Sequence, residues 1–115
     1  MDSKDTKVLE KIVEHCQSII EVTRDISDAE QFQNNNMESK AALFDLMQIG
    51  ELVQNGLSRD AVQQLDAIPW EQIYAMRNRI VHGYASVDHV IIWDTIQEDI
   101  PALKNEIEEY IKGNQ

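Results

Sequence analysis

The chain has 115 residues, 43% hydrophobic and 27% charged, which is typical of a single soluble globular domain spanning residues 1–115. Its 21 acidic and 10 basic residues give a net charge of −11 and exclude a broad nucleic-acid-binding surface, because such surfaces depend on Lys and Arg. No apolar run is long enough to predict a membrane span, and the one cysteine, Cys16, predicts a reducing, cytoplasmic location.

The hydrophobic pattern predicts an all-α fold. A first helix is expected over residues 5–23, where apolar residues recur at spacings of three and four. Ser27 and Glu30 have the spacing of a capping box, which predicts a short second helix. That helix should end at the three asparagines of residues 34–36, because asparagine favours turns.

A third helix is expected over residues 38–54, with Gly56 as its C′ glycine. Gly50 lies in its interior, where glycine costs about 1 kcal/mol relative to alanine. A close helix crossing at that point would justify the glycine. Ser58 is expected to cap a segment of one or two turns that ends near Ala67.

The next helix is expected to run from Pro69, which suits a first turn, to Gly83, which can adopt the positive φ of a helix stop. A last helical region follows from Asp88, its expected N-cap, to Lys112. Pro101 must kink or split this region, because its ring clashes with the carbonyl four residues back. The pattern therefore predicts four main helices with the last one broken.

The stretch RNRIVHGY, residues 77–84, concentrates chemistry on this acidic chain. Arg77 can bind a phosphate with two parallel hydrogen bonds, His82 can take or give a proton near neutral pH, and Asn78 can orient either group. These side chains suit cleavage of an RNA phosphodiester, because the ribose 2′-hydroxyl is an internal nucleophile. The three histidines lack the spacing of a metal site, so no metal is expected.

The same stretch also fits a helix C-terminus, which attracts Arg and His through the helix dipole. In a regular helix Arg77 and His82 lie about 140° apart and do not converge. Either a changed backbone at Gly83 or a second chain would be needed to bring them together. Spacing alone leaves both interpretations open.

Arg77, Asn78, His82 and Tyr84 resemble the Arg-x4-His-x-Tyr motif of HepT-like (DUF86) toxins, a branch of the HEPN ribonuclease superfamily. Their flanks are similar to the same family. The resemblance covers about residues 5–112 and rests on the segments IPWEQIYAMRNRIVHGY, VDHVIIWDTIQEDIPALKNEI and IGELVQNGLS.

This resemblance implies a four- to five-helix up-and-down bundle that forms a homodimer with its two motifs facing each other. It implies a metal-independent endoribonuclease toxin that needs no cofactor, with Arg77 and His82 as catalytic residues and RNA as the substrate. It further implies a minimal nucleotidyltransferase (MNT) antitoxin as the cognate partner in a toxin–antitoxin pair. That antitoxin would silence the toxin by transferring AMP to Tyr84.

Three residues have expected supporting roles. Asn78 is the polar residue of the motif. Arg79 is expected to aid RNA or nucleotide binding, or else to form a surface salt bridge. Glu51, next to Gly50, is expected to hold Arg77 in position, or else to be a surface glutamate.

Other interpretations stay open at this stage. The chain could be a non-catalytic subunit that helps a nucleotidyltransferase bind nucleotide or substrate, or a plain helical interaction domain. The intact pair of Arg77 and His82 favours the enzyme. Trp70 and Trp93 could stack on RNA bases, but burial in the bundle is the more common role of tryptophan.

Overall fold

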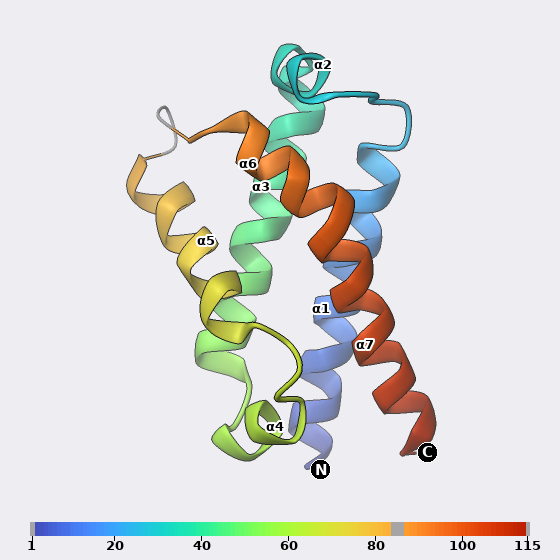
Figure 1. Ribbon diagram of the computed structural model, residues 1–115. Helices are drawn as coiled ribbons and strands as arrows, with labels where there is room; N and C mark the ends of the chain where they lie inside the picture. The colour runs from blue at the N-terminus through green and yellow to red at the C-terminus, as the bar shows by residue number, and fades with distance from the viewer. Residues whose placement is uncertain (1, 84–86, 115) are drawn as a thin grey trace.

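Four long helices run alternately up and down and form a bundle (Figure 1). The computed structural model describes residues 2–83 and 87–114, and these contain no β-strand, which confirms the predicted all-α class. The long helices are α1 (Ser3–Val22), α3 (Asn36–Glu51), α5 (Trp70–Gly83) and α7 (Ile100–Gly113); the short helices are α2 (Ala29–Asn34), α4 (Arg59–Gln64) and α6 (His89–Asp94).

Helix α3 packs between α1 and α5, and α1 also packs along α7. The inward faces of these helices share one core, whose largest fully buried side chains include Leu9, Ile12, Ile49, Ile80 and Ile107. Helix α5 is held mainly by α3, so it forms one edge of the bundle. Within residues 2–83 and 87–114, no helix is long and apolar enough to cross a bilayer.

Trp70 and Trp93 are both buried in the bundle, which is the more common role of tryptophan named above. The indole N–H of Trp70 donates to the Leu65 carbonyl oxygen at 2.9 Å, which fixes the chain where α5 begins. The Trp93 ring packs against Phe32, with ring centroids 5.6 Å apart, and joins α6 to α2. Cys16 lies in the core, where burial raises the pKa of its thiol to about 12.

Of the helix caps predicted from the sequence, those of α4 and α6 are found in the structure, and that of α2 lies one residue later. Ser58 Oγ accepts a hydrogen bond from the Ala61 N–H at 3.1 Å, and Asp88 Oδ1 accepts from the Val90 N–H at 2.9 Å, as predicted. The prediction of Ser27 as the cap of α2 is wrong by one residue. Asp28 is the cap, because its carboxylate accepts from the Gln31 N–H at 2.8 Å.

Two wider, π-helical turns interrupt the helices: η1 (Leu52–Gly56) follows α3, and η3 (Thr95–Asp99) joins α6 to α7. The Ile100 N–H bonds the Thr95 carbonyl, and Pro101 then occupies the first turn of α7, where no N–H is needed. The predicted break at Pro101 is therefore confirmed, and η3 accommodates it without ending the helical path.

Gly56 and Gly83 were predicted to end helices by adopting a positive φ, and the structure shows another conformation at both. Gly56 lies inside η1 and Gly83 is the last residue of α5, and no glycine in the described part of the chain has a positive φ. The left-handed stop predicted at these positions is wrong. At Gly56 the reason for glycine is space, because a Cβ there would lie 3.0 Å from Val8 Cγ1 on α1.

Candidate functional site

The site begins with the crossing of α3 and α5. A Cβ built on Gly50 would lie 2.3 Å from Arg77 Cβ and 2.7 Å from Arg77 Cγ. Only glycine allows the two helices to approach this closely, so the predicted reason for Gly50 is confirmed. The crossing fixes the base of the Arg77 side chain against α3.

Three side chains surround the Arg77 guanidinium. Its Nη2 forms an ion pair with Glu51 Oε1, its Nη1 donates to Asn78 Oδ1 at 2.8 Å, and its Cζ lies 5.7 Å from the centre of the Tyr74 ring. The distance to Tyr74 is within the range of a cation–π contact. The second oxygen of Glu51 accepts from Asn55 Nδ2 at 2.9 Å, so the carboxylate is itself oriented.

The guanidinium is held but not enclosed. The Arg77 side chain is 22% exposed and that of Glu51 is 38% exposed. The Nε atom of Arg77 is buried and lacks a hydrogen-bond partner within the described residues. A permanent cation is therefore presented at the surface, and it can exchange the Glu51 carboxylate for another anion that offers two oxygens to the guanidinium, such as a phosphate.

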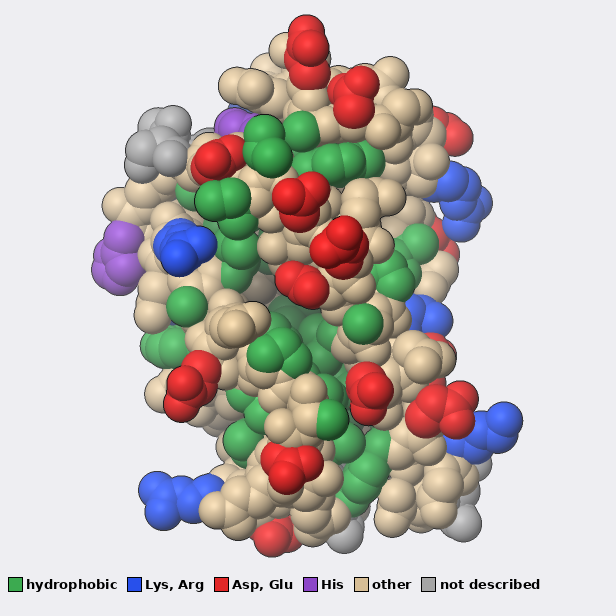
Figure 2. All heavy atoms as spheres, in the orientation of Figure 1, with side chains coloured by type: hydrophobic (Ala, Val, Ile, Leu, Met, Phe, Trp, Pro, Cys, Tyr) green, Lys and Arg blue, Asp and Glu red, His purple; other side chains and the backbone are tan. Residues whose placement is uncertain are grey.

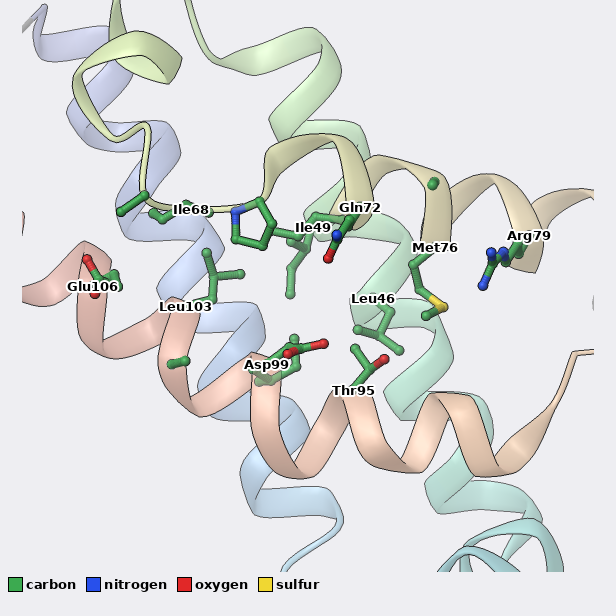
Figure 3. A pocket seen from close by; sticks show the side chains of 16 residues that line it. Leu46, Ile49, Ile68, Gln72, Met76, Arg79, Thr95, Asp99, Leu103 and Glu106 are labelled. Carbon is green, nitrogen blue, oxygen red and sulfur yellow. The ribbon is translucent and has the colours of Figure 1, made fainter.

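The structure does not bring all the predicted residues together in one chain. His82 is exposed and lies on the regular part of α5, so about 140° separates it from Arg77 around the helix axis. Arg79 is two residues from Arg77 and points to the other side of α5, where it lines a groove (Figure 3). Tyr84, the predicted site of modification, lies outside the described residues.

Glu51 and Asn78 both contact the Arg77 guanidinium, and two further residues complete its surroundings. Tyr74 precedes Arg77 by three residues, and this i, i+3 spacing could have indicated the contact. Asn55 follows Glu51 by four residues and could have been found in the same way. Within residues 2–83 and 87–114, no cluster of His, Cys, Asp and Glu could hold a metal ion.

Comparisons with known proteins identify the family. The family model described as "Ribonuclease HepT-like" matches residues 12–110. The chain belongs to the HepT-like family. This confirms the family that the motif and its flanks resemble.

Two relatives of this HepT-like protein match it over most of their length. A protein of Methanocaldococcus jannaschii named "Putative RNase MJ1380" is 33% identical over 94% of this chain and 98% of its own. "Probable ribonuclease HepT" of Thermococcus cleftensis is 36% identical over 90% of this chain and 93% of its own. The comparison with solved structures gives no match.

Proposed function

We propose that this HepT-like protein is a metal-independent endoribonuclease that acts as a toxin in the cytoplasm. The observation that carries the proposal is the placement of Arg77, whose base is fixed by Gly50 and whose guanidinium stays partly exposed beside Asn78. Membership of the HepT-like family and the ribonuclease names of its relatives support the same activity. The single cysteine, Cys16, supports the cytoplasmic location.

The active unit in this proposal is a homodimer with the two α5 helices facing each other. One chain does not make Arg77 and His82 converge, so a second copy has to supply the missing group. Phe44 and Val81 support this arrangement, because they are large apolar side chains that are 56% and 41% exposed. Phe44 lies seven residues before Glu51 on α3, and Val81 lies four residues after Arg77 on α5, so both share the face of the site.

Cleavage then needs only groups that the two chains provide. One His82 takes the proton of the ribose 2′-hydroxyl, and the 2′-oxygen attacks the phosphorus. The bond from phosphorus to the 5′-oxygen breaks, and the other His82 gives that oxygen a proton. Arg77 stabilises the negative charge that builds on the phosphorane oxygens. The products are a 2′,3′-cyclic phosphate and a free 5′-hydroxyl.

The mutational test uses His82 and a matched surface cation. His82→Ala is expected to lower the rate of RNA cleavage in EDTA at least about 100-fold, the usual contribution of a general acid–base group. Arg59→Ala, which removes an exposed cation from α4, is expected to leave the rate unchanged. Thermal melting should show both variants folded. A wild-type protein that never met an antitoxin and still cleaves no RNA would refute the enzyme and favour a nucleotide-binding subunit of a nucleotidyltransferase.

We further propose that a cognate minimal nucleotidyltransferase silences the enzyme by transferring AMP to Tyr84. Tyr84 is seven residues from Arg77 in the sequence, and an adenylate attached to it would bring a phosphate that can compete for the guanidinium. Intact-mass spectrometry of the protein co-expressed with the nucleotidyltransferase should show one added AMP. Tyr84→Phe should abolish the addition, and an unmodified wild-type protein would contradict the proposal.

A further inference from the structure

A groove separate from Arg77 runs between α5 and the segment formed by η3 and α7 (Figure 3). Its volume is about 520 Å³, which is in the range of small-molecule pockets. Leu46 and Ile49 of α3 lie at its floor, together with apolar side chains from both walls. The groove exists because α5 packs mainly on α3 and leaves the gap to α7 unfilled.

The two walls have helical spacing over matching lengths. Residue 69 just before α5 and residues 72, 76 and 79 of α5 line one side of the groove, and residues 95, 99, 103 and 106 line the other along η3 and α7. Each wall therefore extends for about three helical turns, or about 16 Å. Ala75 and Ala102 line the groove from its two walls and are exposed, and their small side chains do not obstruct it. These dimensions fit one short helix laid lengthwise, with contacts at i, i+3 or i+4, and i+7.

The charges at the mouth indicate what kind of helix fits. Asp99 and Glu106 are both exposed on the wall formed by η3 and α7, seven residues apart, and neither has an ion-pair partner among the described residues. Arg79 and Gln72 occupy the α5 wall. Figure 2 shows the apolar hollow on this face with acidic side chains gathered over α6 and α7. With a net charge of −11, the chain as a whole also attracts cations.

We propose that this groove binds a short amphipathic helix from another protein. The apolar stripe of that helix lies on Ile73, Met76 and Ala102, above the buried floor formed by Leu46 and Ile49. Lysines or arginines spaced seven residues apart face Asp99 and Glu106, and an acidic residue near one end meets Arg79. The burial of apolar area supplies the affinity, and the charge pattern sets the direction and the choice of partner.

The groove and the Arg77 site occupy opposite sides of α5. The groove-lining positions 72, 76 and 79 are centred about 180° from Tyr74, Arg77 and Val81 around the helix axis. A bound helix would therefore leave the Glu51–Arg77 pair accessible. The inference does not depend on ribonuclease activity, and binding can be measured without RNA.

The test uses a labelled synthetic peptide of about 14 residues, built from leucine on one face and lysine along one edge, and fluorescence anisotropy. Ala75→Trp, which places a ring in the mouth of the groove, is expected to weaken binding at least tenfold. Ser18→Trp, an equal change at an exposed position of α1, is expected to change it less than twofold. A peptide with glutamate in place of lysine should bind at least tenfold more weakly than the lysine peptide.

A pair of charge reversals separates the groove from general attraction to an acidic protein. Asp99→Lys with Glu106→Lys should weaken binding at least tenfold, whereas Glu10→Lys with Glu14→Lys on α1 makes the same change in net charge and should have less than a twofold effect. Equal weakening by the two double variants would overturn the proposal, as would a lysine peptide that does not bind. Sedimentation that changes with Ala75→Trp would show that a second copy of the chain covers the groove, which also overturns it.

Discussion

The Arg77 side chain lies partly in the core and partly at the surface. Its Cβ and Cγ fill the space that Gly50 leaves free, while its guanidinium is held by Glu51 and Asn78 at the edge of the bundle. Glu51 both orients the cation and neutralises it. In the proposed function, a phosphate that binds Arg77 displaces this carboxylate, so Glu51 would compete with RNA for the same donor atoms.

This competition gives a prediction for Glu51→Gln. In the His82→Ala background, in which cleavage is expected to be at least about 100-fold slower, the substitution is expected to strengthen binding of an RNA oligomer by up to about fivefold. The reason is that a partly exposed ion pair contributes about 0.2–1 kcal/mol. Fluorescence anisotropy measures the affinity, with Glu14→Gln on α1 as a control for the change in net charge. Weaker binding in Glu51→Gln would mean that the carboxylate chiefly holds the guanidinium in its binding orientation.

At the level of the helices, the crossing of α3 and α5 decides where the site lies. α5 has α3 as its main support, so a shift of this one crossing moves both the Arg77 side of α5 and the groove side. The closeness of the crossing outweighs the usual cost of about 1 kcal/mol for glycine inside a helix.

Gly50→Ala should therefore destabilise the protein although alanine is the better helix former. A methyl group at 2.3 Å from Arg77 Cβ cannot be relieved by rotating a flexible side-chain end, so the helices must move apart. The expected loss is about 1–3 kcal/mol in the free energy of unfolding, measured with urea. Gly113→Ala is the matched control, because nothing lies within 4 Å of its added Cβ, and it should not destabilise. Equal stabilities for Gly50→Ala and wild type would contradict the close crossing.

On the scale of the whole molecule, a buried carboxylate ties the start of the chain to its middle. Asp5 on α1 accepts two hydrogen bonds from Ser58, one from the backbone N–H at 2.8 Å and one from the hydroxyl at 2.7 Å. The hydroxyl bond, followed by the backbone bond, lowers the pKa of Asp5 below its ordinary value of 3.8. Ser58 also caps α4, so this contact joins α1 to the segment between α3 and α5.

The depressed pKa fixes the direction of a pH effect on stability. The charged Asp5 stabilises the fold fully above its unfolded pKa, and this contribution is lost as pH falls through the lower, folded pKa. Asp5→Asn should therefore cost about 1.5 kcal/mol near pH 7, the usual value of a hydrogen bond to a charged group. The cost should shrink below about pH 3.8. Urea unfolding at several pH values measures this, with the exposed Asp66→Asn as control; a cost that does not vary with pH would contradict it.

Local chemistry made much of this fold predictable. The helix order, the Ser58 and Asp88 caps and the break at Pro101 each depend on a few neighbouring residues, and the structure confirms them. The motif and its flanks likewise predicted the family. Contacts between distant segments were not predictable in this way: Asp5 and Ser58 are 53 residues apart, and the spacing of α5 from α7 leaves no periodic signal in the sequence.

In the candidate site, too, features that depend on neighbouring residues were predictable, and contacts between distant segments were not. Gly50 inside a helix predicted a close crossing, and its neighbour Glu51 was an expected partner of Arg77, but either alternative for Glu51 fitted the sequence equally well. Only the placement of α3 against α5 decided between them. For His15 there was no signal in the sequence at all. Nothing in its local sequence indicated that its Nδ1 would lie 2.8 Å from Asp45 Oδ1 across the interface of α1 and α3.

The divided role of Arg77 also has a practical use. Its aliphatic part supports the helix crossing, and its charged end carries the proposed chemistry. Replacement with methionine would keep the buried methylenes and remove only the cation. If the proposed function is correct, Arg77→Met offers a folded form that lacks the proposed catalytic cation and is suitable for large-scale expression.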